Sequence, residues 1–454
     1  MKNNSLYRAA LLPALALLCL APAAWPQGFQ ITPLPLAKNA KAKPDEFPEQ
    51  KAKRELAANY VRMNVLIGSR DYDALEKITQ DWLAQYRAKK TDADQYRALL
   101  NTLAPAKDGK GMLNDMLAWT QARPKSYAAW YALGRLYHDI AWQERGARYA
   151  SQTTSAQFEA MGKYAQLSQE AYIKSVTLTN TPVASYDQLV RIATISGRPR
   201  TGVVEMLKSM LPSGQKRFCP AKYAADGIYP STFDEQLYYL CLALRSDPNA
   251  VETFGGFVFY NSPRWGGSYA RLEKVLEEIA GDKRIEPPAL ARMRAELLAQ
   301  EGEDAARNND PRGAAELYVQ AFHAAPMPEH VQWMYKAAYF EKFNTKNLDR
   351  AQALFGEIAA YRPGEYEAIA AIGWIYEERG DLKKYMENMA VAAGLGMKEA
   401  QNNLGYYYMV GQRGLPRDLQ QAKEWLTLAA NQGFEHSREK LGLVDAMIAK
   451  EKAK

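Results

Sequence analysis

Five consecutive residues combine the side chains and backbone that proteins use to bind anions. They are Arg264, Trp265, Gly266, Gly267 and Ser268. They directly precede a segment with helical periodicity, Tyr269–Ala280. Backbone N–H groups at a helix start, with a guanidinium beside an indole ring, can hold a small anion or substrate. The alternative is structural: the tryptophan packs into the core, the glycines form a turn and the serine caps the helix.

Other residues that commonly carry chemistry are not spaced for it. None of the four histidines stands in a metal-ligand motif such as H-E-x-x-H; they are His138, His323, His330 and His436. The chain contains no G-x-S-x-G elbow and no phosphate-binding Gly-Lys-Ser/Thr loop. We therefore expect a protein that is not an enzyme and that needs no metal and no cofactor.

The first 23 residues resemble a secretory signal. Lys2 and Arg8 precede an apolar stretch, and Ala21-Pro22-Ala23 has the small-x-small pattern that precedes cleavage. The apolar stretch is shorter than the about 20 residues of a membrane-spanning helix. The sequence predicts a chain that is exported to the periplasm or secreted, with no stable membrane span.

Cysteine usage predicts one disulfide bond. Cleavage of the signal removes Cys19 and leaves Cys219 and Cys241. Two cysteines in an exported protein most simply pair with each other. Two buried free thiols are the alternative.

Helical repeats dominate the rest of the chain. Trp130-x2-Leu133-Gly134-x2-Tyr137 has the pattern of the first helix of a tetratricopeptide repeat. Related spacing returns in the C-terminal part, and the clearest copy is Glu399–Gly433. This copy looks like a Sel-like repeat, a relative of the tetratricopeptide repeat with a longer loop between its helices. Both repeat types are known mainly as protein-interaction scaffolds, which is what the resemblance implies here.

Two further segments carry a second resemblance. Arg145-Gly146 with Tyr149-Ala150, and Pro263 to Ser268, resemble signatures of a bacterial domain family of unknown function, numbered 4034. The resemblance covers roughly residues 123–280. It implies an all-helical exported domain and carries no known activity.

The predicted fold is all-α: a superhelical solenoid of tetratricopeptide and Sel-like helix pairs behind a helical N-terminal domain. The expected domains are a signal peptide (1–23), a flexible leader rich in Pro and Lys (24–50), a helical domain of unknown function (51–285) and a repeat array (286–450). The formal charge of +7 falls to +5 without Lys2 and Arg8, and basic residues are interspersed with acids. We therefore expect no nucleic-acid partner.

The leading functional hypothesis is a non-enzymatic scaffold that binds a protein or peptide in the bacterial envelope. Four residues lie between the packing positions of the clearest repeat and are candidates for the binding surface: Asn402, Asn403, Tyr406 and Tyr407. They also fit ordinary surface positions. Two alternatives remain, a small anion or substrate site at Arg264–Ser268 and an accessory role in secretion or toxin immunity.

Overall fold

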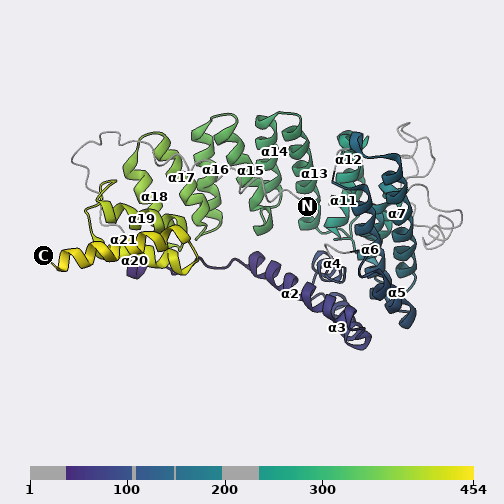
Figure 1. Ribbon diagram of the computed structural model, residues 1–454. Coiled ribbons are helices and arrows are strands. Elements are labelled where there is room, and N and C mark those ends of the chain that lie inside the picture. Colours follow the sequence, from purple (N-terminus) through teal and green to yellow (C-terminus); the bar gives the residue numbers. More distant parts are fainter. Residues whose placement is uncertain (1–36, 105–108, 148–149, 197–234, 454) are drawn as a thin grey trace. The chain divides into compact units, whose positions relative to one another are not determined.

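The computed structural model describes residues 37–104, 109–147, 150–196 and 235–453. Throughout these ranges the chain forms helices joined by loops (Figure 1). The predicted all-α class is confirmed. Of the predicted features, the signal peptide, Cys219 and a helix expected at 202–211 lie outside the described residues.

The chain divides into two compact units, which we describe separately. Unit 2 runs from Glu46 to Leu354, and its α-helices are α2 (Pro48–Gly68), α3 (Tyr72–Arg87), α4 (Ala93–Asn101), α5 (Leu113–Ala122), α6 (Tyr127–Arg145), α7 (Ser155–Val176), α8 (Val183–Ser196), α10 (Glu235–Ser246), α11 (Val251–Tyr260), α12 (Tyr269–Ala280), α13 (Pro287–Arg307), α14 (Pro311–Ala324) and α15 (Val331–Phe343). Helix α16 (Leu348–Tyr361) crosses the border at Phe355.

Unit 1 joins the described residues up to Asp45 to the C-terminal hundred residues. Its helices are η2 (Ala37–Asn39, a 3-10 turn), α17 (Tyr366–Glu378), α18 (Leu382–Gly394), α19 (Lys398–Val410), α20 (Leu419–Asn431) and α21 (Glu435–Lys452). The border between these compact units is not the predicted domain border at 285/286, and the predicted domain limits stay a prediction. None of the described helices combines the length and the apolar character that crossing a membrane requires.

Side-chain caps set where several helices begin, as their sequences predict. Asp71, Asp92, Thr154 and Ser268 each accept a hydrogen bond from a backbone N–H of the first turn that follows. These bonds satisfy N–H groups that have no partner inside the helix. Gly255 and Gly256 lie inside a helix, α11, although glycine is a poor helix former.

Helices pack in sequential pairs, and glycines of the repeat motif bring the partners close. The main pairs are α6 with α7, α13 with α14, α17 with α18, and α19 with α20. A Cβ atom on Gly134 of α6 would lie 2.8 Å from the ring of Tyr172 on α7. A Cβ atom on Gly405 of α19 would lie 2.6 Å from Leu426 of α20. At both positions the absence of a side chain allows the second helix of the pair to approach closely.

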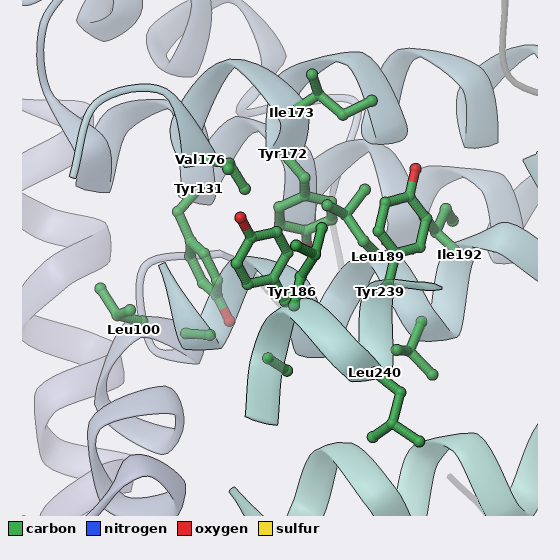
Figure 2. Close-up of a cluster of buried hydrophobic side chains, with 14 of the residues drawn as sticks. Leu100, Tyr131, Tyr172, Ile173, Val176, Tyr186, Leu189, Ile192, Tyr239 and Leu240 are labelled. Carbon is green, nitrogen blue, oxygen red and sulfur yellow. The ribbon is translucent and has the colours of Figure 1, made fainter. Parts of the chain in front are cut away.

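Tyrosines fill much of the core of unit 2. Tyr131, Tyr172 and Tyr239 are buried among Leu and Ile side chains from α4, α6, α7, α8 and α10 (Figure 2). The rings of Tyr131 and Tyr172 meet edge to face with centroids 5.5 Å apart, a favourable aromatic geometry. The Tyr131 hydroxyl donates to Asn101 Oδ1 at 2.8 Å. The hydroxyl group therefore has a polar partner although the ring is completely buried.

Candidate functional site

One face of unit 1 holds a segment of its own chain. Residues 37–45, which we call the docked segment, lie against the end of α18 and against α20. The backbone N–H of Lys41 donates to the Gly394 carbonyl oxygen at 2.9 Å, and the Lys41 carbonyl oxygen accepts from Gln401 Nε2 at 2.9 Å. The N–H of Ala37 donates to Gln421 Oε1 at 3.5 Å. Part of the predicted flexible leader is therefore held on the repeat helices.

Two glutamines beneath the docked segment, Gln401 and Gln432, are hydrogen-bonded to each other. We call Gly394, Gly396, Gln401, Gln421 and Gln432 the docking face. Gln401 is fully buried and donates a second hydrogen bond, to the Ala393 carbonyl oxygen at 3.1 Å. Gln432 Nε2 donates to Gln401 Oε1 and to the Gly396 carbonyl oxygen, both at 2.9 Å. These bonds fix the Gln401 amide in the orientation that meets the Lys41 carbonyl.

The fit of the docked segment depends on small side chains. Ala37 is 3% exposed and belongs to the same hydrophobic cluster as Leu404 and Trp425. Ala40 packs against this cluster, whereas Lys38, Lys41 and Lys43 are exposed. Gly396 has φ +100°, and a Cβ atom there would lie 2.5 Å from the Lys43 carbonyl carbon. The docking face thus contacts backbone and alanines and leaves the lysines in solvent.

The four predicted partner-binding residues lie on α19, but they differ in exposure. Asn402 is buried, and its Oδ1 accepts from Ser437 Oγ at 3.0 Å and Lys440 Nζ at 2.9 Å. Tyr407 is buried, with its hydroxyl 3.2 Å from that of Tyr385. Asn403 and Tyr406 are partly exposed. The binding role of the four stays a prediction, and only the latter two present surface in this structure.

The five residues of the predicted anion site form a turn and a helix cap. Trp265 packs 5.6 Å from Tyr260 between ring centroids, and the exposed Arg264 lies 5.7 Å from the indole. Gly266 has φ +87°, and a Cβ atom on Gly267 would collide with the Asn261 carbonyl oxygen. Ser268 Oγ accepts from Arg271 N at 3.3 Å. The turn and the cap of the structural alternative are present, whereas Trp265 is only partly buried; anion binding at Arg264–Ser268 stays a prediction.

A cluster of charged side chains in unit 2 was not foreseen from the sequence. We call it the charged cluster; its members are Asp94 and Arg97 of α4, Asp187 and Arg191 of α8, Glu252 of α11, and Arg292 and Glu296 of α13. Arg191 forms a two-point interaction with Asp187, with both N–O distances 3.1 Å. Arg97 pairs with Glu252 at 3.1 Å, and Arg292 with Asp94 at 2.9 Å. Ion pairs therefore connect four helices far apart in sequence.

Two glycines in the middle of α11 make room for the charged cluster. A Cβ atom on Gly256 would lie 3.1 Å from Arg191 Cζ, and one on Gly255 would lie 3.4 Å from Glu296 Oε2. Glycine inside a helix costs about 0.5–1 kcal/mol relative to alanine. The close approach of Arg191 and Glu296 therefore explains why two glycines stand inside this helix.

Burial changes the acidity of two carboxyl groups in the charged cluster. Burial, with repulsion from Glu252, raises the pKa of Asp94 to about 7 despite the nearby arginines. The same two causes raise the pKa of Glu296 to about 7. Both groups therefore hold a proton under conditions in which an exposed carboxyl is ionised. Such groups can exchange protons near neutral pH.

His138 has a structural role inside a helix. His138 is buried in the middle of α6, rather than at a surface or helix end, and its Nε2 accepts from Trp142 Nε1 at 3.0 Å. Burial and nearby arginines lower the pKa of His138 to about 3, so it is neutral. Within the four described ranges, no group of three or more His, Cys, Asp or Glu side chains is arranged to hold a metal ion.

The helix pairs described above define a helical-repeat protein. Comparison with family models finds two different families in two parts of the chain. Residues 59–220 match the domain of unknown function 4034, and residues 398–434 match the Sel1 repeat. Both predicted resemblances are confirmed. The first match begins and ends earlier than the predicted extent, so Pro263–Ser268 lies beyond it. Gln401, Gln421 and Gln432 of the docking face all fall inside the Sel1 repeat.

Two solved structures show distant likeness to this chain. A protective antigen present in uropathogenic Escherichia coli strains, displaying an SLR fold, is 19% identical, with 85% of this chain and 82% of that chain covered and a TM-score of 0.30. The human IFIT1 dimer with PPP-AAAA is 13% identical, with 84% and 87% covered and a TM-score of 0.28. At these TM-scores neither likeness supports a statement about function. A comparison with the curated proteins found no match.

Proposed function

We propose that this protein is an exported, non-enzymatic scaffold of the bacterial envelope that binds an extended protein segment on the docking face of unit 1. The observation that carries the proposal is the docked segment itself. A stretch of chain lies there as a 3-10 turn followed by irregular backbone, held by hydrogen bonds of its backbone to Gly394 and Gln401 and by a buried alanine. A surface that holds one such segment has the chemistry to hold another.

The composition of the docking face supports binding rather than catalysis. Its polar groups are amides and backbone carbonyls, which donate and accept hydrogen bonds and do not change their protonation between about pH 5 and 9. The Sel1 repeat supplies a rigid helix pair beneath these groups, because Leu426 packs closely over Gly405. Export is supported by the pattern of the first 23 residues.

A cross-linking pull-down from envelope extract tests the proposed function. The bait is the full mature chain with an amine cross-linker, and the cross-links must map by mass spectrometry to Lys398 or Lys423, which lie on α19 and α20. The matched control bait carries Gln401→Glu, which replaces the amide donor by a carboxylate and repels an incoming carbonyl oxygen. We expect a partner that is cross-linked to the wild-type bait and reduced at least about fivefold with the control. Cross-links absent from α19 and α20, or a partner recovered equally with both baits, would count against the proposal.

A further inference from the structure

We propose that the docked segment is an internal ligand that occupies the docking face until an external segment of the same chemistry displaces it. This inference rests on the proposed function, because it specifies the partner and the regulation of the same site. The external segment is a stretch of another protein that begins with a 3-10 turn, with a small residue at its first and fourth positions and a proline at its eighth, the spacing of Ala37, Ala40 and Pro44.

Backbone contacts make the site able to accept a different chain. The docking face meets the segment through the N–H and carbonyl oxygen of Lys41 and the N–H of Ala37. Every residue except proline offers these groups, so another sequence in the same conformation makes the same three bonds. A replacement must bring one carbonyl oxygen to Gln401 Nε2, since that amide is buried and its other donated bond already goes to Ala393.

Side-chain contacts define which sequences fit. Ala37 is almost completely buried and Ala40 is partly buried in the cluster formed by α18, α19 and α20. A larger or charged side chain at either position would have to leave the cluster or lose its hydration. Gly396 lies directly against the backbone of Lys43 and Pro44. The exposed Lys38, Lys41 and Lys43 make no such demand, so their positions tolerate other residues.

The internal contact is weak enough to be exchanged. Three hydrogen bonds, the buried Ala37, the partly buried Ala40 and the close approach of Gly396 to the backbone hold the segment, and both packed side chains are small, so little apolar area leaves water when it docks. The covalent connection makes docking of the segment an intramolecular event, which favours it over a free chain at low concentration. A partner that makes additional contacts with unit 1 therefore displaces the segment, whereas a chain that makes only the same contacts does not.

A peptide-binding measurement tests the internal-ligand proposal. The probe is a fluorescein-labelled peptide of residues 37–46, followed by fluorescence anisotropy with the full mature chain. In the release variant Ala37→Arg, the buried alanine becomes a charged side chain and the segment loses its place. We expect the peptide to bind this variant at least about tenfold more tightly than the wild type, because the internal competitor is gone.

Matched variants separate displacement from general loosening. Ala40→Arg is a second release variant, and Ala42→Arg changes an exposed residue of the same segment and should behave as the wild type. Adding Gln401→Glu to Ala37→Arg should remove binding, as should Ala37→Arg in the peptide. Circular dichroism and the unfolding midpoint of unit 1 report whether each variant keeps its fold.

Three outcomes would overturn the proposal. Equal affinity of wild type and both release variants would show that the segment does not compete, and no binding to either release variant would show that the face does not accept a free chain. A wild-type dimer that dissociates when peptide is added would assign the segment to a second copy instead. In each case a partner cross-linked to α19 or α20 would still support the proposed function, so the two failures are distinguishable.

Discussion

Glu296 of α13 lies beside α11, where water reaches only part of its side chain. Its carboxyl group is in contact distance of a glycine on α11 and keeps 30% of its side-chain surface exposed. Burial, followed by the charge of Glu252, raises its pKa to about 7. An unfolded chain would titrate the same group near about 4.3. The folded protein therefore binds this proton more tightly than the unfolded chain does.

Replacing Glu296 by glutamine should change the pH dependence of stability. Between about pH 4.5 and 7 the native state holds a proton that the unfolded state has released, so wild-type stability falls as pH rises through this window. Glu296→Gln removes the contribution of this group while that of Asp94 remains, and we expect its free energy of unfolding at pH 8 to exceed that of the wild type by about 1–2 kcal/mol, with little difference at about pH 4.5. Urea unfolding at both pH values measures this.

The exposed Glu55 of α2 provides the control for this titration. Its side chain is 62% exposed, and Glu55→Gln should leave the pH profile as it is in the wild type. A profile of Glu296→Gln parallel to that of the wild type would contradict the assigned burial of Glu296.

Single residues show where sequence reasoning about sites reaches its limit. The turn and cap at Gly266, Gly267 and Ser268 were among the stated alternatives, because local patterns determine local geometry. The charged cluster was not found, since Arg97, Arg191 and Arg292 come from helices far apart in the chain. The signal in the sequence was Gly255-Gly256 in an apolar helix, a pattern that indicates close approach by another group.

Pairs of helices are the unit in which this chain packs, and the small residue between them sets their distance. Gly134 of α6 faces the ring of the fully buried Tyr172. Gly162 in α7 faces open space, because a Cβ atom added there would have no neighbouring atom within 4 Å. The same substitution therefore has opposite consequences at the two positions.

Alanine at Gly134 should destabilise unit 2 and alanine at Gly162 should stabilise it. Gly134→Ala forces the ring of Tyr172 or one helix to move, which costs about 1–3 kcal/mol in a well-packed core. Gly162→Ala adds helix propensity without a clash and should contribute about 0.5–1 kcal/mol. The two variants are compared by chemical unfolding followed by circular dichroism, and a destabilised Gly162→Ala would contradict the described environment of α7.

The predicted disulfide bond would join Cys241 of α10 to Cys219, which precedes this helix in the sequence. Cys241 lies buried in α10, and Cys219 lies outside the described residues. Non-reducing peptide mapping of the exported chain should find the two cysteines linked, and reduction should lower stability by about 3 kcal/mol in the chain-entropy model. Two free thiols in the exported protein would refute the bond.

Helices were the part of the fold that the sequence predicted best. Apolar residues at helical spacing and capping residues such as Asp71 and Thr154 act within a few residues, so they are readable directly. Docking of residues 37–45 was not readable, because a stretch rich in Pro and Lys has no apolar period of its own. Its order comes from Gln401, which lies 360 positions further along the chain than Lys41, and from Gly394.

For the molecule as a whole, the two compact units do not follow the order of the chain. Unit 1 takes residues from both sides of unit 2, so the chain passes between the units twice, after Asp45 and within α16. Family matches do not reveal this arrangement, since the residues that match the domain of unknown function 4034 belong to unit 2 and those that match the Sel1 repeat belong to unit 1. Contacts between distant residues, rather than sequence patterns, determine which residues share a unit.

The docked segment also sets an order of events during synthesis. The hydrogen bond from Ala37 to Gln421 joins residues 384 positions apart. At about 5–20 residues per second, a ribosome needs roughly 20–80 s to make the chain between them. Throughout that interval the segment exists and its docking face does not, so a chaperone or another newly made protein has first access to the alanines and lysines. Unit 1 can therefore be completed only after the C-terminal helices have been synthesised.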